Sequence, residues 1–197
     1  MISTEEALQQ LLKKRSVMIM GHITEELLTK AKGNLVKLAL ESPSEVTLLF
    51  DTDGGDCEPG MWFVDLVNSL PVPTRGVVIG ACNSIGIPIL QACRTRVATR
   101  HSRFYFHSIS GVFKFSAGDE DVEKNFLARL KESRDLENQI CKYLSKRSGQ
   151  TIPAVRELMR KGDRDKADVT AAEAKKLGFV DEVVDRFQLF PESKPAP

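Results

Sequence analysis

Cysteine and long apolar runs are scarce in this sequence of 197 residues. The cysteines, Cys57, Cys82, Cys93 and Cys141, stand singly, without the C-x-x-C pairs of zinc or redox sites, and we interpret them as buried free thiols. No apolar run approaches the length that spans a bilayer, and the opening stretch MISTEEALQQLLKKR is amphipathic rather than signal-like. We therefore expect a cytoplasmic protein that does not act at a membrane.

An excess of charge of one sign is also lacking. Lysine and arginine number 28 against 27 aspartate and glutamate residues, which gives a net charge of +1 and does not favour nucleic acid as a partner. A hydrophobic content of 42% is typical of a folded protein. The length predicts a single domain over residues 1–190, and the proline-rich end predicts a disordered tail over residues 191–197.

Strand-like and helix-like segments alternate along the first half of the chain. The apolar, β-branched runs EVTLLF (45–50) and TRGVVIG (74–80) predict strands covered on both faces, and helical patterns follow at 59–70 and 84–93. An earlier strand, SVMIMGHI, closes at Gly21 between helices capped by Ser3 or Thr4 and by Thr24. This alternation predicts an α/β fold of crossover units with parallel strands.

The pattern changes in the second half of the chain. Two short strands are predicted within RVATRHSRFYFH, followed by a long charged helix over about 119–147. At about 1.5 Å per residue this helix extends well beyond a small domain, so we expect it to pack against another subunit. A helix over 152–160, a polar loop KGDRDKAD, a short helix TAAEAKKLG and a strand FVDEVV complete the prediction.

Two glycine-containing turns, DTDGGD and GACNS, follow neighbouring predicted strands. In an open sheet of crossover units, such turns form the crevice where ligands bind. We expect Ser84 in the first turn of the next helix, where its hydroxyl could attack a carbonyl group. The N–H of Ile85, with that of Gly54 or Gly55, could then hold the oxyanion. A simple N-cap is the common role for such a serine, and Ser84 alone does not decide between the two.

His107 ends the apolar run FYFH, where an imidazole facing the crevice could take the serine proton. A structural histidine bonded within the sheet is the alternative. A carboxylate would complete a triad, and Asp163, Asp165 and Asp168 all lie in the loop GDRDKAD. Spacing does not choose among them, and a cluster of charges in a loop is usually solvated.

Four stretches, in order, resemble the motifs of the ClpP serine peptidases. FDTDGGDCEPGMWFVDLV is similar to their N-S-P-G-G…G…I-x-D stretch, and GACNSIG to their nucleophile motif G-x-A-A-S-M-G. SRFYFHSISG is similar to their histidine motif S-R-x-M-I-H-x-P-x-G, and TAAEAKKLGFVDEVV to their closing segment. The similarity runs from about Arg15 to Val184. Because the motifs occur together and in order, they are far more specific than any one of them.

The resemblance implies a serine endopeptidase that cleaves peptides or unfolded proteins through an acyl-enzyme, with no metal or organic cofactor. Ser84 would be the nucleophile and His107 the general base, and the backbone N–H groups of Gly55 and Ile85 would form the oxyanion hole. The third triad member of the family is an aspartate that precedes the closing segment. Counting back from TAAEA without a gap places Lys166 where this aspartate belongs. A one-residue insertion restores Asp165 within a D-R-D pattern, with Asp168 as the second choice.

The resemblance also implies an architecture and partners. The fold would be a ClpP/crotonase-like spiral of ββα crossover units, and the long helix would be a protruding handle through which heptameric rings stack into a tetradecamer. A strand around Gly111–Phe115 would align the peptide by main-chain pairing. A Clp-type ATPase is the implied partner, although little sequence before the first helix could form axial loops, so a stand-alone peptidase is also possible.

Two other functions remain open at this stage. Asp53 and Asn83 replace a proline and a small apolar residue of the family motifs, which leaves a catalytically silent ClpP-like subunit as one alternative. A crotonase-type acyl-CoA enzyme, which shares the architecture and holds an enolate-like oxyanion with backbone N–H groups, is the other. The presence of both Ser84 and His107 in matching motifs argues against the acyl-CoA enzyme.

Overall fold

The structure is a computed structural model that describes residues 3–116, 118 and 120–188. Asp119, where the long helix was predicted to begin, and the predicted tail at 191–197 lie outside these residues. In chain order the elements are α1 (Thr4–Lys13), β1 (Ser16–Ile23), α2 (Glu25–Glu41), β2 (Val46–Gly55), α3 (Cys57–Ser69), β3 (Thr74–Cys82), α4 (Gly86–Ala92), β4 (Thr95–Thr99), β5 (Arg103–Phe104), α5 (Val122–Ser148), α6 (Ile152–Asp165), β6 (Val169–Thr170), α7 (Ala171–Lys176) and β7 (Glu182–Val184).

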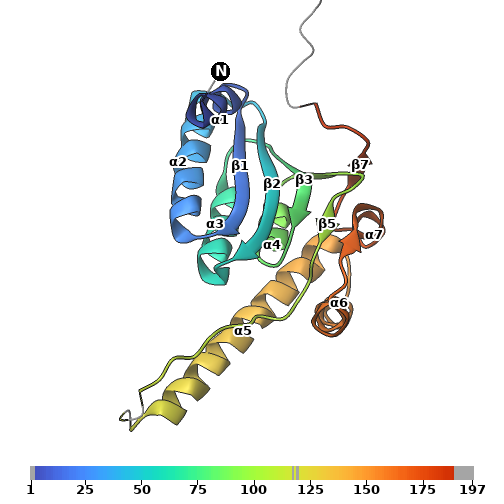
Figure 1. The fold of residues 1–197 in the computed structure, drawn as a ribbon. Coiled ribbons are helices and arrows are strands. Elements are labelled where there is room, and N and C mark those ends of the chain that lie inside the picture. The colour runs from blue at the N-terminus through green and yellow to red at the C-terminus, as the bar shows by residue number, and fades with distance from the viewer. Residues whose placement is uncertain (1–2, 117, 119, 189–197) are drawn as a thin grey trace, which may run out of the picture.

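The strands form a sheet in the order β1-β2-β3-β4-β7, in which every neighbouring pair is parallel (Figure 1). β5 branches from β3 in parallel and pairs with β6 antiparallel. Because parallel neighbours need crossover connections, helices lie between the strands, and the predicted α/β class is confirmed.

The central strands are covered on both faces, as their continuous apolar runs predicted. In β2, Leu48 and Phe50 belong to the main hydrophobic core that helices α2, α3 and α4 share. Leu49, which points to the other face, packs with Val77 and Val97 in a second cluster, against Leu11 of α1. Alternate side chains of one strand thus enter two separate cores.

Side-chain caps begin several helices where the sequence predicted them. Ser3 and Glu6 form a reciprocal capping box at α1, and Thr24 accepts the N–H of Leu27 at α2. Thr170 and Glu173 form a second capping box at α7. The predicted helix starts are confirmed at these positions. The observed first residues differ from the predicted ones only by shifts that different definitions of a helix boundary would also give.

Two predicted boundaries are wrong. β2 does not stop before DTDGGD but continues to Gly55, because Gly54 and Gly55 pair with His22 and Ile23 of β1. α6 does not end at Arg160 but continues to Asp165, so Asp163 and Asp165 lie on a helix rather than in a loop.

Gly162 lets the last part of α6 pack closely on the backbone of Phe106. A Cβ atom at this position would lie 1.7 Å from the carbonyl oxygen of Phe106, so the glycine allows the helix to pack directly on that backbone. Tyr105 donates its hydroxyl to the carbonyl of Gly162 at 3.1 Å. The helix ends at Asp165, and the C-cap residue Lys166, with a left-handed backbone (φ 51°), donates its N–H to the carbonyl oxygen of Gly162.

The predicted strand at Gly111–Phe115 is not formed. Residues 105–116 contain no strand; this segment instead runs along α5 as an extended chain (Figure 1). The ring of Phe113 meets that of Phe126 on α5 at a centroid distance of 5.3 Å. We call this segment the strap (residues 105–116); it contacts α5 through this ring pair, while its pairing with a bound peptide stays a prediction.

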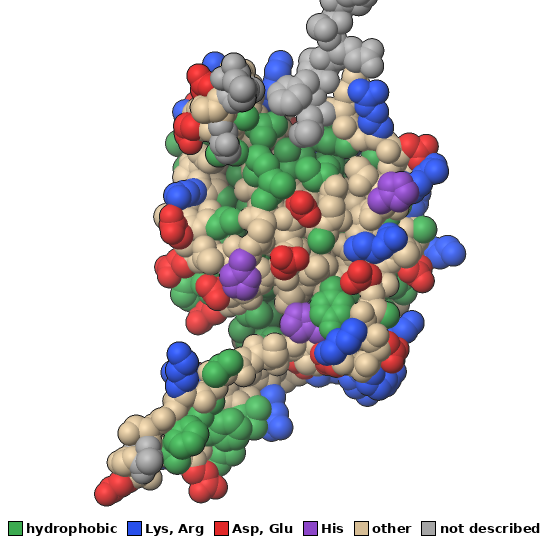
Figure 2. Space-filling view, viewed as in Figure 1, with side chains coloured by type: hydrophobic (Ala, Val, Ile, Leu, Met, Phe, Trp, Pro, Cys, Tyr) green, Lys and Arg blue, Asp and Glu red, His purple; other side chains and the backbone are tan. Residues whose placement is uncertain are grey.

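Helix α5 has 27 residues, about 40 Å, and protrudes from the body of the molecule. Its buried residues, Ile140, Cys141 and Leu144, all lie in its C-terminal half. The protruding end carries exposed apolar side chains, and Figure 2 shows them as a green group on the arm. Within the described ranges, none of the helices combines the length and the apolar character needed to cross a membrane.

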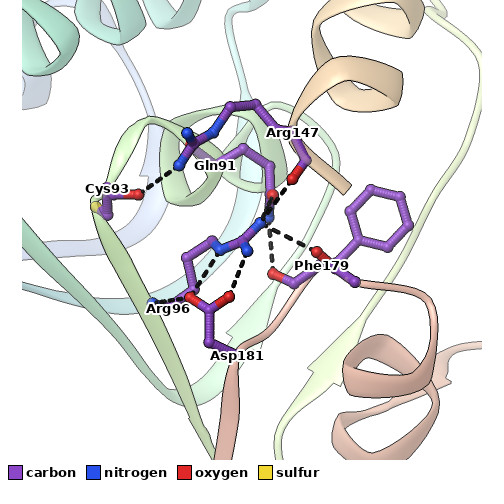
Figure 3. Close-up of polar contacts among 7 residues, drawn as sticks. Gln91, Cys93, Arg96, Arg147, Phe179 and Asp181 are labelled. Atoms are coloured by element: carbon purple, nitrogen blue, oxygen red, sulfur yellow. Dashed lines mark hydrogen bonds and ion pairs between the residues drawn. The ribbon is translucent and has the colours of Figure 1, made fainter. Parts of the chain in front are cut away.

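A polar network anchors the C-terminal end of α5 (Figure 3). Arg147 donates to the carbonyl oxygens of Gln91 at 2.6 Å and Cys93 at 2.8 Å, at the end of α4. Arg96 of β4, which is buried, pairs with Asp181 and donates to the Gln91 side chain. Burial opposes ionisation of Asp181, but the hydrogen bonds from Arg96 outweigh it, and its pKa is lowered.

Candidate active site

Ser84 lies in a strained turn between β3 and α4. Its φ is 52°, in the left-handed region that side-chain-bearing residues rarely adopt. The prediction that Ser84 lies in the first helical turn is wrong, because α4 begins at Gly86. Ser84 is not the N-cap either, since that position is Ile85, without a side-chain cap bond. Backbone strain of this kind is concentrated at functional sites.

Hydrogen bonds hold the turn in this conformation. The N–H of Ser84 donates to the carbonyl of Tyr105 at 2.9 Å, and the carbonyl of Ser84 accepts from Ile87 at 3.0 Å. Asn83 accepts from Gly86 through its carbonyl and from the N–H of Tyr105 through its side-chain oxygen, both at 2.9 Å. The turn is therefore bonded both to α4 and to the strap.

The predicted amide donors lie on the two segments that flank Ser84. Gly54, next to Gly55 at the end of β2, has φ 89°, and a Cβ atom there would lie only 2.6 Å from the Cβ of Ser84. Ile85 is buried and packs against Gly60 of α3. The backbone of β2 thus touches the serine turn directly, while the use of Gly55 and Ile85 as an oxyanion hole stays a prediction.

Ser84 and His107 line the same cavity, which we call the serine pocket. Its volume is about 20 Å³, close to the space of one water molecule. Apolar side chains make up most of the wall, among them Ile85, Ile87, Pro88, Phe106 and Ile109. The structure therefore places the predicted nucleophile and the predicted base in the wall of one small, largely apolar pocket.

His107 is held on two sides. Its ring stacks on that of Tyr105, with a centroid distance of 5.2 Å and an interplanar angle of 28°. Its Nδ1 atom lies 2.7 Å from the carbonyl oxygen of Ser108. A main-chain carbonyl, not a carboxylate, thus occupies the position at Nδ1 that the triad prediction assigns to an aspartate.

The three candidate aspartates have different surroundings. Asp163 accepts the N–H of Ser108 with both carboxylate oxygens, at 3.3 Å each. Asp165, the last residue of α6, lies 4.0 Å from the Nε of Arg164 and does not line the serine pocket. Asp168 lines a separate cavity of about 270 Å³ between α6 and α7. The role predicted for Asp165 stays a prediction.

Sequence reasoning missed two side chains of the serine pocket, Cys57 and Glu137. Burial, and then the charge of Asp56, raise the pKa of the Cys57 thiol, which favours its neutral form. Glu137 accepts the N–H of Ile109 at 2.9 Å. A signal for it does exist, because Glu137 continues the buried stripe of Ile140, Cys141 and Leu144 at helical spacing.

Within the described part of the chain, no three His, Cys, Asp or Glu side chains gather into a possible metal site. The chemical groups of the serine pocket are a hydroxyl, an imidazole, a thiol and a carboxylate. A hydroxyl and an imidazole in one pocket are the groups that nucleophilic acyl transfer can use.

Comparison with known proteins supports the same chemistry. The model of the Clp protease family matches residues 3–187. The ATP-dependent Clp protease proteolytic subunit 2 of Thermobifida fusca (strain YX) is 30% identical over 183 residues, covering 91% of this chain and 85% of that protein. Among solved structures, a ClpP1 mutant from Listeria monocytogenes matches with a TM-score of 0.77 at 22% identity, covering 91% of this chain and 96% of that chain.

These matches define the class of protein as a serine peptidase on a crossover α/β fold with a projecting helix. The predicted ClpP-like fold is confirmed by the structural match. Because the family model spans nearly the whole sequence, the chain belongs to the Clp protease family, and the resemblance seen in its motifs is confirmed.

Proposed function

We propose that this protein is an endopeptidase in which Ser84 is the nucleophile and His107 the general base. The observation that carries the proposal is the position of both residues in one pocket, with Ser84 on a strained turn. Membership of the Clp protease family supports the reaction class. The substrate would be a peptide or an unfolded protein segment, since an extended chain is needed to reach the narrow pocket.

The chemical steps follow from the two side chains. Nε2 of His107 accepts the hydroxyl proton as the Oγ atom of Ser84 bonds to the substrate carbonyl carbon. The imidazolium then gives this proton to the leaving amine as the C–N bond breaks, which leaves an ester on Ser84. Water, deprotonated by the same imidazole, hydrolyses the ester and restores both residues. These steps consume one water and use no metal or cofactor.

The oxyanion would be held by the backbone N–H groups of Gly55 and Ile85. Support comes from the contact between Gly54 and Ser84, which puts the end of β2 beside the nucleophile. Donors fixed in a dry site stabilise a developing charge far more than donors in water do, because they need no reorganisation.

Assembly and partners belong to the same proposal. The long exposed arm of α5 supports stacking of rings, heptameric in each ring, around a closed chamber. The name of the Thermobifida fusca relative supports a Clp-type ATPase as a partner. A stand-alone peptidase would degrade unfolded protein without ATP, so assays with and without a Clp ATPase separate the two modes of action.

A catalytically silent ClpP-like subunit is the second candidate. The bond from Nδ1 of His107 to a main-chain carbonyl, and a pocket of only about 20 Å³, favour this reading. The crotonase-type acyl-CoA alternative gains no support, because the family model that spans the chain is that of the Clp proteases.

The decisive test is the labelling of Ser84 by a fluorophosphonate, followed by mass spectrometry of the modified peptide. Ser84→Ala should abolish labelling and peptide cleavage, while the matched variant Ser69→Ala, at an exposed position on α3, should keep both. Wild-type protein that is never labelled, although folded and assembled, would support the silent subunit. Labelling of Ser84→Ala at the wild-type rate would exclude Ser84 as the nucleophile.

A further inference from the structure

One peptide group joins His107 to a carboxylate that the sequence motifs do not include. The carbonyl oxygen of this group, which belongs to Ser108, lies 2.7 Å from Nδ1 of His107. The N–H of the same group, on Ile109, donates to Oε2 of Glu137 at 2.9 Å. His107, one peptide plane and Glu137 therefore form a continuous chain of hydrogen bonds.

The chemistry of these atoms fixes the tautomer of His107. A carbonyl oxygen can only accept, so Nδ1 must carry the proton in this contact. In the neutral ring, Nε2 is then the unprotonated nitrogen, which is the form a general base needs. A carboxylate at the far end of the peptide polarises it, and this polarisation makes the carbonyl oxygen a stronger acceptor.

The position of Glu137 is built into the fold. Its side chain is 22% exposed, although the residue lies on a charged and largely solvated helix. The Nη1 atom of Arg156 lies 3.7 Å from its Oε1 atom, and Arg156 is also bonded to Asn138. The hydrogen bond from Ile109 and the contact with Arg156 therefore fix both carboxylate oxygens of Glu137 in place.

Asp163 supports the same segment from the other side, because it accepts the N–H of Ser108. The two peptide groups that follow His107 are thus each fixed by a carboxylate, one from α6 and one from α5. Only Glu137 bonds to the peptide whose carbonyl meets the imidazole, and only Glu137 also lines the serine pocket.

We propose that Glu137 is a positioning residue for His107 and acts through the Ser108–Ile109 peptide, where the family resemblance would use Asp165. This inference rests on the proposed function, since it concerns the base of that site. Negative charge at Glu137 would hold the proton on Nδ1 and would stabilise the imidazolium that forms as Ser84 is acylated.

The test compares Glu137→Gln with Glu132→Gln, an exposed glutamate on the same helix. Glutamine keeps an acceptor for Ile109 but removes the charge, so we expect Ser84 acylation by a fluorophosphonate to slow about 10-fold, and Glu137→Ala to slow it about 100-fold. The ¹⁵N shifts of the His107 ring should report a proton on Nδ1 in the wild type and a mixture of tautomers in Glu137→Ala. Glu132→Gln should match the wild type in both measurements.

Two results would overturn the proposal. One is a Glu137→Gln protein with the wild-type acylation rate and unchanged His107 ring shifts. The other is a change of those shifts in Asp165→Asn but not in the Glu137 variants, which would assign the positioning role to Asp165. If wild-type Ser84 is never acylated, the proposed function fails, whereas the ring shifts still decide whether Glu137 sets the tautomer. Glutamine is isosteric with glutamate, so this variant should fold even if Glu137→Ala does not.

Discussion

Asn83 and Tyr105, each of which directly precedes a residue that lines the serine pocket, are hydrogen-bonded to each other. The side-chain oxygen of Asn83 accepts the N–H of Tyr105 at 2.9 Å, and the next residue, Ser84, donates its own N–H to the carbonyl of Tyr105 at the same distance. Both backbone groups of Tyr105 are therefore fixed to the serine turn. Because the Tyr105 ring stacks on His107, this pairing links the serine turn to the imidazole.

The Asn83 side chain should therefore be needed for activity. In Asn83→Ala the Tyr105 N–H loses its partner, and we expect the free energy of unfolding to fall by about 1 kcal/mol and Ser84 acylation to slow. Asn83→Asp keeps an acceptor oxygen and should retain most of both. Urea denaturation and fluorophosphonate labelling measure the two effects. Equal behaviour of the alanine and aspartate variants would show that the bond does not position the site.

Gly54 should be irreplaceable at the end of β2. An alanine there would need φ near 89° and would place its Cβ atom 2.6 Å from that of Ser84, so the serine turn must move. We expect Gly54→Ala to abolish acylation of Ser84. Gly33→Ala is the matched control, because Gly33 lies within α2 with no atom near its Cβ position and should gain up to about 1 kcal/mol of stability. An active Gly54→Ala protein would show that the contact is not required.

The backbone strain at Ser84 should have a measurable effect on the free energy of unfolding. Glycine adopts a left-handed backbone without the penalty that other residues carry, so Ser84→Gly should be more stable than Ser84→Ala by about 1 kcal/mol. Both variants lack the hydroxyl, so the comparison isolates the backbone. Equal free energies of unfolding in urea would mean that the turn relaxes when the serine is removed.

Much of the fold was predictable because its signals are local. The β-branched runs of β2 and β3, the caps Ser3 and Thr24, and the order of strands and helices all depend on neighbours in the sequence. The errors fall where distant segments decide. The end of β2 depends on pairing with Ile23, and the last part of α6, beyond its predicted end, packs on the backbone of Phe106 at Gly162.

The candidate site shows the same difference between residues found from local signals and residues whose contacts are distant in the sequence. Ser84 and His107 were identified from their motifs, and the structure places both in one pocket. Asn83 was interpreted only as a departure from the family pattern, because nothing local shows that its side chain accepts from Tyr105. Glu137 was missed for a related reason: its contact joins the middle of α5 to the strap, 28 residues earlier in the sequence.

The pairing of Asp181 with Arg96 should make stability fall in acid. The pKa of Asp181 is lowered in the folded protein, so the unfolded chain binds a proton at higher pH than the folded one. The contribution of Asp181 to the free energy of unfolding is therefore fully present above the ordinary carboxyl pKa of 3.8. It is lost as the pH falls from that value through the lowered pKa of the folded protein.

Asp181→Asn should flatten this part of the pH dependence of unfolding, measured by urea denaturation at a series of pH values. The control is Asp185→Asn, which removes an exposed carboxylate paired with Arg100 on the surface. If Asp181→Asn and the wild type lose stability in parallel as the pH falls, other carboxylates account for the acid sensitivity.

The exposed apolar side chains of the α5 arm should drive assembly. Phe126 and Leu127 are 46% and 54% exposed, and Val112 and Phe115 of the strap are exposed as well. Figure 2 shows a green group of hydrophobic side chains on the arm. An isolated chain would leave this apolar surface in water, which is unfavourable by roughly 25 cal/mol per Å². If the rings stack as proposed, we therefore expect Leu127→Glu to separate them into single rings, which sedimentation velocity would detect as a smaller particle.

Arg129→Glu is the matched control, because residue 129 is about 200° around the helix from Leu127 and introduces the same carboxylate on the opposite side. It should leave the particle size unchanged if the apolar side of the arm is the contact. Because each protomer carries its own serine pocket at the base of the arm, single rings of Leu127→Glu should still react with a small fluorophosphonate. Loss of labelling together with loss of stacking would instead mean that contact between arms holds the strap, and with it His107, in position.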